Sequence, residues 1–244
     1  MSRFSASAPF FARFAALLGL TLAALCGSAH GGESAKDASF LAGPAAKHNG
    51  VASLPQWTHI LSQYEKNKDT YAACREAPGG CASDRVAVWQ QFIGAVKDQP
   101  DFRQIAYVNH WVNRMPYRQD ELVYGDNDHW ASVEEFLAYA GDCEDFAIMK
   151  YLTLRELGFP AKRMHVAMVY DIFSGTDHAF LVVESDGGVE YVMDNRETGT
   201  DPALFAARYK PHFAFNEKSL RTYNSPLMAR SIRKSDTSVM TGNR

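Results

Sequence analysis

The segment GDCEDFAIMKYLTLRELG, residues 141–158, is the most informative part of the chain. From residue 143 to residue 157 it is apolar on most sides, which is typical of a helix buried in a protein core. Asp142 is a residue type that favours the N-cap position, and a glycine and a proline after the segment end the helix. We therefore expect a buried helix over 143–157 that carries Cys143 in its first turn.

Helical patterns precede this segment and strand patterns follow it. Apolar residues recur at helical spacing over 53–66, 84–97 and 101–112, and a capping box predicts a short helix from Ser132. Residues 115–130 are typical of a loop. Later, residues 165–170, 177–184 and 189–194 are rich in Val, Met, Phe and Tyr, which favour strands. Because helices come first and strands later, we expect one α+β domain over 53–226.

The first thirty residues have the pattern of a secretory signal peptide. Two arginines flank the apolar run 10–25, and small residues follow it up to Ala29. We expect cleavage near Ala29, so that residues 1–29 are removed, residues 30–52 form a flexible leader and residues 227–244 form a flexible tail. A retained membrane anchor is the alternative. Because the apolar run is short, we favour export to the periplasm with no membrane insertion of the mature chain.

Charge and composition exclude several classes of protein. The 244 residues are 46% hydrophobic and 22% charged, which are ordinary values for a globular domain. The formal net charge is −3, with 25 basic and 28 acidic residues. A nucleic-acid-binding domain usually has a basic excess, so we expect no nucleic-acid partner.

Three cysteines remain after the signal peptide. Cys74 and Cys81 enclose the flexible sequence REAPGG, and exported proteins keep their disulfides, so we predict a Cys74–Cys81 disulfide. Cys143 is then unpaired. A free thiol in an oxidising compartment is a candidate reactive group, and the alternative is an inert buried cysteine.

The position of Cys143 favours the reactive interpretation. The dipole at the start of a helix favours a thiolate, which is the nucleophilic form of cysteine. Such a nucleophile needs a base and a group that orients the base. His178 begins the predicted strand 177–184, and Asp194 ends the strand 189–194. In a hairpin around residues 186–188, the numbers of paired residues add up to about 372 or 373. His178 and Asp194 add up to 372, so one plausible register places them directly opposite each other on one face, whereas a one-residue slip separates them.

Three motifs then resemble one known family. They are GDCEDFA at 141–147, DHA at 177–179 and MDN at 193–195. In this order they resemble the bacterial transglutaminase-like cysteine proteinases, over about residues 57–223. The resemblance implies a papain-like fold, in which a buried helix with the cysteine packs on an antiparallel sheet with the histidine and the aspartate. It also implies that Cys143 is the nucleophile, His178 the general base and acid, and Asp194 the orienting carboxylate.

Acidic residues surround the candidate nucleophile. Asp142, Glu144 and Asp145 fit the general preference for acids at a helix start, which is the simpler interpretation. Three carboxylates also repel a thiolate and raise its pKa, and a hard cation such as Ca²⁺ relieves this repulsion. The family resemblance implies that these three acids bind calcium.

The resemblance further implies a biological setting. It implies a periplasmic, calcium-dependent endopeptidase that cleaves the N-terminal region of a large surface adhesin and so releases cells from a biofilm. It implies a second partner, the periplasmic domain of an inner-membrane cyclic-di-GMP receptor that sequesters the protease. Two alternatives stay open: a transglutaminase-type acyl transferase with the same triad, and a non-enzymatic calcium-modulated binding module in which Cys143 is structural.

Overall fold

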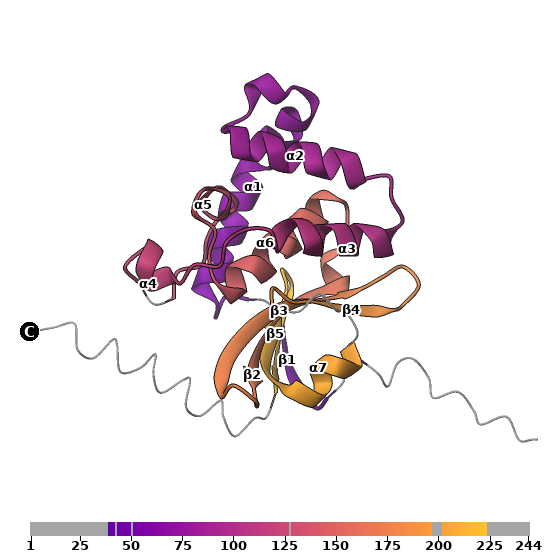
Figure 1. Cartoon of the computed structure of the whole chain (residues 1–244). Helices are drawn as coiled ribbons and strands as arrows, with labels where there is room; N and C mark the ends of the chain where they lie inside the picture. Colours follow the sequence, from indigo (N-terminus) through magenta and orange to yellow (C-terminus); the bar gives the residue numbers. More distant parts are fainter. Residues whose placement is uncertain (1–38, 42, 50, 127, 197–201, 224–244) are drawn as a thin grey trace, which may run out of the picture. The chain divides into compact units, whose positions relative to one another are not determined.

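The computed structural model describes residues 39–41, 43–49, 51–126, 128–196 and 202–223 (Figure 1). The predicted signal peptide, residues 1–29, and the predicted tail, residues 227–244, lie outside the described residues. Within the described part of the chain, none of the helices is long and apolar enough to span a membrane.

Six α-helices precede the main strands. They are α1 (Pro55–Glu76), α2 (Asp84–Val96), α3 (Asp101–Val112), α4 (Asp120–Val123), α5 (Val133–Tyr139) and α6 (Cys143–Glu156). The predicted helix over 53–66 continues to Glu76, and α4 forms inside the segment that we predicted as a loop. A disulfide joins Cys74, near the end of α1, to Cys81, as predicted.

The second half of the chain supplies most of a single six-stranded sheet. The strands are β2 (Met164–Asp171), β3 (Thr176–Glu184), β4 (Glu190–Met193), β5 (Tyr209–Phe215) and β6 (Ser219–Tyr223), together with β1 (Ala45–Asn49) from the start of the chain. Their order is β1-β6-β5-β2-β3-β4, and every neighbouring pair is antiparallel. A seventh helix, α7 (Pro202–Arg208), precedes β5. The fold class is therefore α+β with an antiparallel sheet, as predicted.

The prediction of a flexible leader over 30–52 is wrong for Ala45–Asn49. This segment is β1, and it pairs along its whole length with β6, from Ala45 opposite Tyr223 to Asn49 opposite Ser219. Its sequence AAKHN has no strand pattern of its own, and the strand that pairs with it comes from the other end of the domain. Phe40 and Leu41, just before β1, are buried as well.

Side chains alternate between two cores on opposite faces of the sheet. On β3, Leu181 and Val183 belong to the larger core, which contains α1, α2, α3, α5 and α6. Phe180 and Val182 point to the smaller core, which includes Phe205 of α7. Figure 1 shows α6 above the sheet and α7 below it. This alternation is the period of two that a buried strand requires.

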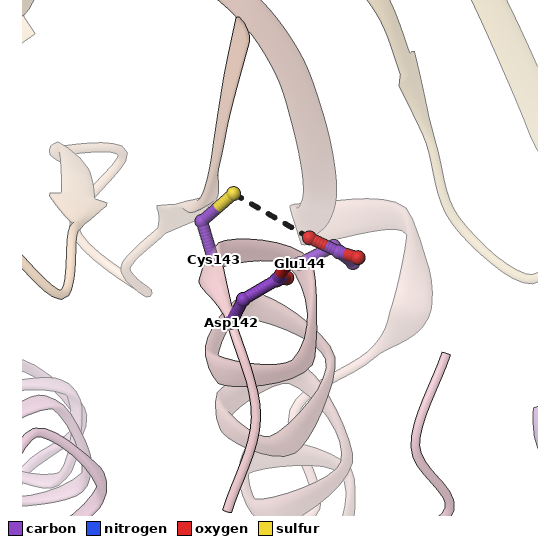
Figure 2. Close-up of side chains that lie close together, drawn as sticks. All are labelled: Asp142, Cys143 and Glu144. Atoms are coloured by element: carbon purple, nitrogen blue, oxygen red, sulfur yellow. Dashed lines mark hydrogen bonds between the residues drawn. The ribbon is translucent and has the colours of Figure 1, made fainter. Parts of the chain in front are cut away.

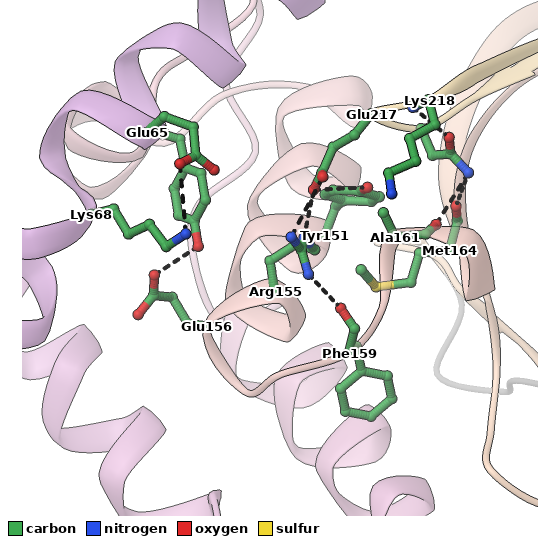
Figure 3. A network of polar contacts seen from close by, with 12 residues as sticks. Glu65, Lys68, Tyr151, Arg155, Glu156, Phe159, Ala161, Met164, Glu217 and Lys218 are labelled. Carbon is green, nitrogen blue, oxygen red and sulfur yellow. Dashed lines mark hydrogen bonds and ion pairs between the residues drawn. The ribbon is translucent and has the colours of Figure 1, made fainter. Parts of the chain in front are cut away.

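Ion pairs and hydrogen bonds hold the C-terminal end of α6. Arg155 pairs with Glu217 at 2.5 Å and donates to the carbonyl of Phe159 at 2.8 Å (Figure 3). Glu156 accepts a hydrogen bond from Tyr64 at 2.7 Å and pairs with Arg75. Residues 144–154 of this helix are buried throughout. The helix that begins at Cys143 is therefore held along its length by packing in the core and at its C-terminal end by ion pairs and hydrogen bonds.

The register of the β3–β4 hairpin differs from our prediction. Leu181 lies opposite Met193 and Glu184 opposite Glu190, so paired residue numbers add up to 374. The reason is the turn, which is centred one residue later than we assumed: Ser185 bonds to Val189, and Gly188 supplies the positive φ of 75°. Relative to the register that pairs His178 with Asp194 directly, the pairing moves by two residues, so the two side chains stay on the same face as diagonal neighbours.

Candidate active site

Cys143 is the first residue of α6, and Asp142 occupies the N-cap position in extended conformation. The buried residues that follow Cys143 form the rest of α6, and Gly141 and Asp142 separate this helix from α5. Among the described residues, Cys143 is the one free cysteine, and its side chain is partly exposed. Figure 2 shows it at the end of the helix beside Asp142 and Glu144.

Two groups contact the sulfur of Cys143. The thiol donates a hydrogen bond to Oε2 of Glu144 at 3.4 Å (Figure 2). The backbone N–H of Ala179 on β3 donates to the sulfur. Because Ala179 directly follows His178, β3 brings the thiol next to the backbone of the candidate base.

Burial raises the pKa of the Cys143 thiol well above its ordinary value, and the charges of Glu144 and Asp142 raise it further. The backbone N–H of Ala179 acts in the opposite direction. The prediction that nearby carboxylates oppose thiolate formation agrees with this arrangement. Burial and the two carboxylates therefore outweigh the favourable helix dipole.

His178 and Asp194 form a buried pair. Nε2 of His178 lies 2.8 Å from Oδ1 of Asp194, and neither side chain is exposed. The other ring nitrogen, Nδ1, is buried and has no hydrogen-bond partner among the described residues. The rings of Phe180 and Tyr209 pack against the imidazole. One nitrogen is thus held by the carboxylate, and the other is left for a further partner.

Several groups fix Asp194. The backbone N–H of Arg196 donates to Oδ1 at 3.0 Å, and the hydroxyl of Tyr209 donates to Oδ2 at 3.4 Å. Asn113 donates from Nδ2 to the backbone carbonyl of Asp194 at 2.8 Å. Burial alone would raise the pKa of Asp194, but the hydrogen bond and charge of His178 lower it below its ordinary value. The carboxylate is therefore ionised at neutral pH.

Among the described residues, no hydrogen bond joins the thiol of Cys143 to the imidazole of His178. The structure brings His178 to Asp194 and leaves the thiol of Cys143 on Glu144. Sequence reasoning also missed Asn113 and Tyr209. Neither belongs to a motif, and each reaches Asp194 from a distant part of the chain: Asn113 directly follows α3, and Tyr209 begins β5.

The acids at the start of α6 form a cluster with a fourth carboxylate, Asp120. Oxygens of Asp120, Asp142 and Asp145 lie within 4.8 Å of one another, and a second group of ligand atoms with the same spacing combines Asp142, Cys143 and Glu144. Asp120 is buried in α4, and the loop before it is held to Gly141 by the hydrogen bond from Arg118 N–H to the Gly141 carbonyl at 2.8 Å. No sequence pattern linked Asp120 to this cluster, because only the loop contact brings it there.

Two oxygens of the cluster have no hydrogen-bond partner. Oδ1 of Asp120 and Oδ1 of Asp142 are buried and unpartnered within the described part of the chain. Asp145 differs, because its oxygens accept from the backbone N–H groups of Ala131 at 2.7 Å and Asp142 at 3.1 Å. Asp145 thus also braces the start of the helix.

The surroundings of the acid cluster disfavour the ionised form of several of its carboxyl groups. Burial raises the pKa of Asp120 to about 6, and the charge of Asp142 adds to the effect. Burial also raises the pKa of Glu144 and of Asp145 well above ordinary values. A buried set of oxygen ligands with unpartnered lone pairs fits a hard divalent cation such as Ca²⁺.

Gly141 allows this arrangement, and its replacement by alanine is expected to disrupt it. A Cβ atom at this position would lie 2.0 Å from Oδ2 of Asp145 and 2.6 Å from its Cβ. We expect Gly141→Ala to lower the free energy of unfolding by about 1–3 kcal/mol, the usual result of overpacking. Urea unfolding of the mature protein measures the change.

The neighbouring residue offers a matched control. Ala140 has a φ of 62°, a region that glycine adopts without strain. Ala140→Gly is expected to raise the free energy of unfolding slightly, because about 1–3 kcal/mol of strain is released against roughly 0.5–1 kcal/mol of added chain entropy. Equal stability of Gly141→Ala and the wild type would contradict the close packing against Asp145.

Comparisons with known proteins identify a family for the chain. The model of the family described as bacterial transglutaminase-like cysteine proteinase BTLCP matches residues 65–209, more than half of the chain. No curated protein matches the chain.

Solved structures of LapG from Legionella pneumophila are similar to the chain. The calcium-bound form is 28% identical with a TM-score of 0.52, over 58% of this chain and 80% of that one. The EGTA-treated form is 26% identical with a TM-score of 0.54, over 64% and 86%. A third LapG structure is 26% identical with a TM-score of 0.54, over 68% and 94%.

Proposed function

The chain belongs to the bacterial transglutaminase-like cysteine proteinases, and from this premise we propose that it is a calcium-dependent cysteine endopeptidase with Cys143 as nucleophile, His178 as base and Asp194 as orienting carboxylate. One observation carries the proposal. The buried His178–Asp194 pair, 2.8 Å apart, leaves Nδ1 of the imidazole unpartnered, one residue before the N–H group that contacts the Cys143 sulfur.

The hydrogen bonds of His178 define which nitrogen acts. Because the Asp194 carboxylate is ionised, Nε2 carries the proton that it donates, and Nδ1 has the free lone pair. In the proposed mechanism, the thiol leaves Glu144, turns to Nδ1 and gives up its proton there. The thiolate then attacks the scissile carbonyl carbon.

The same imidazole completes the reaction. The imidazolium protonates the leaving amine as the C–N bond breaks, which leaves an acyl-enzyme on Cys143. His178 then takes a proton from water as the water oxygen attacks the acyl carbon. The C–S bond breaks, the acid product leaves, and the imidazolium returns its proton to the Cys143 sulfur. In the proposed mechanism, backbone N–H groups in the first turn of α6, which have no partner within the helix, stabilise the oxyanion.

We propose that the acid cluster holds Ca²⁺, with Asp120, Asp142, Glu144 and Asp145 as the carboxylates available to it. A bound Ca²⁺ would offset the negative charge that raises the pKa of the Cys143 thiol. The unpartnered oxygens of Asp120 and Asp142 support this assignment, and so does the likeness to LapG, which has been solved both calcium-bound and after EGTA treatment.

Replacement of Glu144 by glutamine is expected to weaken calcium binding at least tenfold. Glutamine keeps the shape of the side chain but removes one of the charges that attract the ion. In the wild type, calcium at a hundred times its Kd is expected to stabilise the fold by about 2.7 kcal/mol. Calorimetric titration and thermal unfolding with calcium or chelator measure both effects.

Glu184→Gln is the control for this experiment, because Glu184 is exposed at the end of β3 and outside the acid cluster. It is expected to bind calcium like the wild type. Wild-type calcium affinity in Glu144→Gln would overturn the assignment of Glu144 as a ligand.

The biological setting follows from the family resemblance, and we propose it on that basis. We propose that the mature protein acts in the periplasm after loss of residues 1–29, that its substrate is the N-terminal region of a large surface adhesin, and that the periplasmic domain of an inner-membrane cyclic-di-GMP receptor sequesters it. The test is calcium titration of adhesin-fragment cleavage, with chelator as control and a labelled primary amine present. Incorporation of the amine without hydrolysis would contradict a protease.

A further inference from the structure

Lys150 is a charged residue type in the middle of the core. It lies in α6, two turns after Cys143, and its side chain has no exposed surface. Its Nζ donates to the backbone carbonyl of Met193 at 3.2 Å and lies 5.9 Å from the centre of the Phe146 ring. Lysine is rarely buried without a compensating partner, because an ammonium group loses its hydration.

The hydrogen bond from Lys150 ends beside the catalytic carboxylate. Met193 is the last residue of β4, and its carbonyl belongs to the peptide bond that leads into Asp194. Burial lowers the pKa of Lys150 to about 7, and the one charge that opposes this effect is that of Asp194. In return, the lysine helps to lower the pKa of Asp194. The helix that carries the nucleophile therefore also places an amine behind the carboxylate, and with a pKa of about 7 this amine carries its positive charge mainly below pH 7.

We propose that Lys150 is a positioning residue for catalysis: through its bond to Met193, it fixes Asp194 against His178, and its charge tunes how readily the imidazole accepts a proton. This inference rests on the proposed function, in which His178 is the base. A methionine or leucine would fill the same volume without burying an amine, so packing alone does not account for a lysine here.

The other groups around the pair approach from different elements. His178 and the Arg196 backbone N–H bind Oδ1 of Asp194, and Tyr209 of β5 binds Oδ2. The charges of Arg196, Arg208 and Asp171 act on Tyr209. Within the described part of the chain, Lys150 is the cation that acts on Asp194 from α6.

The test is the titration of the His178 imidazole by NMR in mature protein labelled with ¹⁵N-histidine. His178→Gln identifies its signals among the 8 histidines of the full sequence. Lys150→Met removes the charge and the donor, and Lys150→Gln removes the charge but keeps an N–H donor. Because a nearby cation disfavours the imidazolium, we expect both variants to raise the titration midpoint of His178 by about one pH unit.

Thr153→Val is the matched control. Thr153 is buried in the same helix, where it accepts from Trp89 at 3.0 Å, and it makes no contact with the His178–Asp194 pair. It is expected to lower stability and to leave the midpoint unchanged. An unchanged midpoint in the folded Lys150 variants would overturn the proposal and make the lysine purely structural.

This readout needs no substrate, so it separates the two hypotheses. A raised midpoint together with tenfold or greater loss of kcat in the Lys150 variants supports the positioning role. A raised midpoint in a wild-type protein that hydrolyses no peptide would refute the proposed protease and leave the link between Lys150 and His178 supported. Should Lys150→Met fail to fold, Lys150→Gln gives the same reading.

Discussion

Replacement of Cys143 by alanine is expected to abolish peptide-bond hydrolysis, with a loss in kcat/KM on the order of 10⁴-fold or more. No other free thiol is present among the described residues, and the two remaining described cysteines are joined in the disulfide between Cys74 and Cys81. Without the sulfur, no acyl-enzyme forms. The measurement is cleavage of an adhesin fragment at saturating calcium.

The fold is expected to survive this replacement. The thiol is partly exposed, and its removal takes away a group that Glu144 and Asp142 repel when it ionises. Thermal unfolding of Cys143→Ala should therefore match the wild type or lie slightly above it. Cys143→Ser is expected to be inactive as well, because a hydroxyl is a much weaker acid than a thiol. Activity within tenfold of wild type in either variant would refute Cys143 as the nucleophile.

Replacement of Asp194 by asparagine is expected to lower kcat/KM by a factor on the order of 10³–10⁴. The side-chain amide can donate to Nε2 of His178, which would place the proton on Nδ1, the nitrogen proposed to receive the thiol proton. The imidazolium would also lose the carboxylate that stabilises it at 2.8 Å. The double variant with Cys143→Ala should show no further loss, because the residues act as a unit.

Asp171→Asn is the control for this second replacement. Asp171 is a buried carboxylate of the same sheet, held by Arg208 at 2.7 Å, and this ion pair keeps the pKa of Asp171 well below its ordinary value. Its replacement should reduce stability but leave kcat near the wild-type value. If Asp171→Asn and Asp194→Asn lose activity equally, the effect of Asp194→Asn reflects folding and the triad assignment fails.

Local patterns predicted the parts of the fold that local forces determine. The apolar residues of α6 and the strand-favouring composition of residues 177–184 were sufficient to place Cys143 at a helix start and His178 on a strand. The sequence also predicted that Asp194 lies on the same face of the hairpin as His178. It did not predict the register, because the position of the turn depends on which glycine takes a positive φ. The pairing of His178 differs from the predicted one by two residues, and because side chains alternate along a strand with a period of two, Asp194 stays on the same face as His178.

Non-local contacts account for what sequence reasoning missed. β1 forms because β6 offers it a sheet edge, and nothing in residues 45–49 indicates that partner. Asp120 joins the acid cluster through the contact of its loop with Gly141, and Lys150 is placed beside β4 by the packing of a helix that is apolar on nearly every side. A buried lysine inside such a helix is a signal that the sequence does contain, and it became interpretable only with the position of Asp194.

The most direct test of the catalytic assignment is the rate at which iodoacetamide alkylates Cys143 in the native mature protein with calcium present, with the site mapped by peptide mass spectrometry. The account predicts fast, single-site alkylation of the wild type and a loss of at least about tenfold in His178→Ala, because the imidazole generates the thiolate. Equal rates in the two proteins, or labelling that requires denaturation, would contradict it.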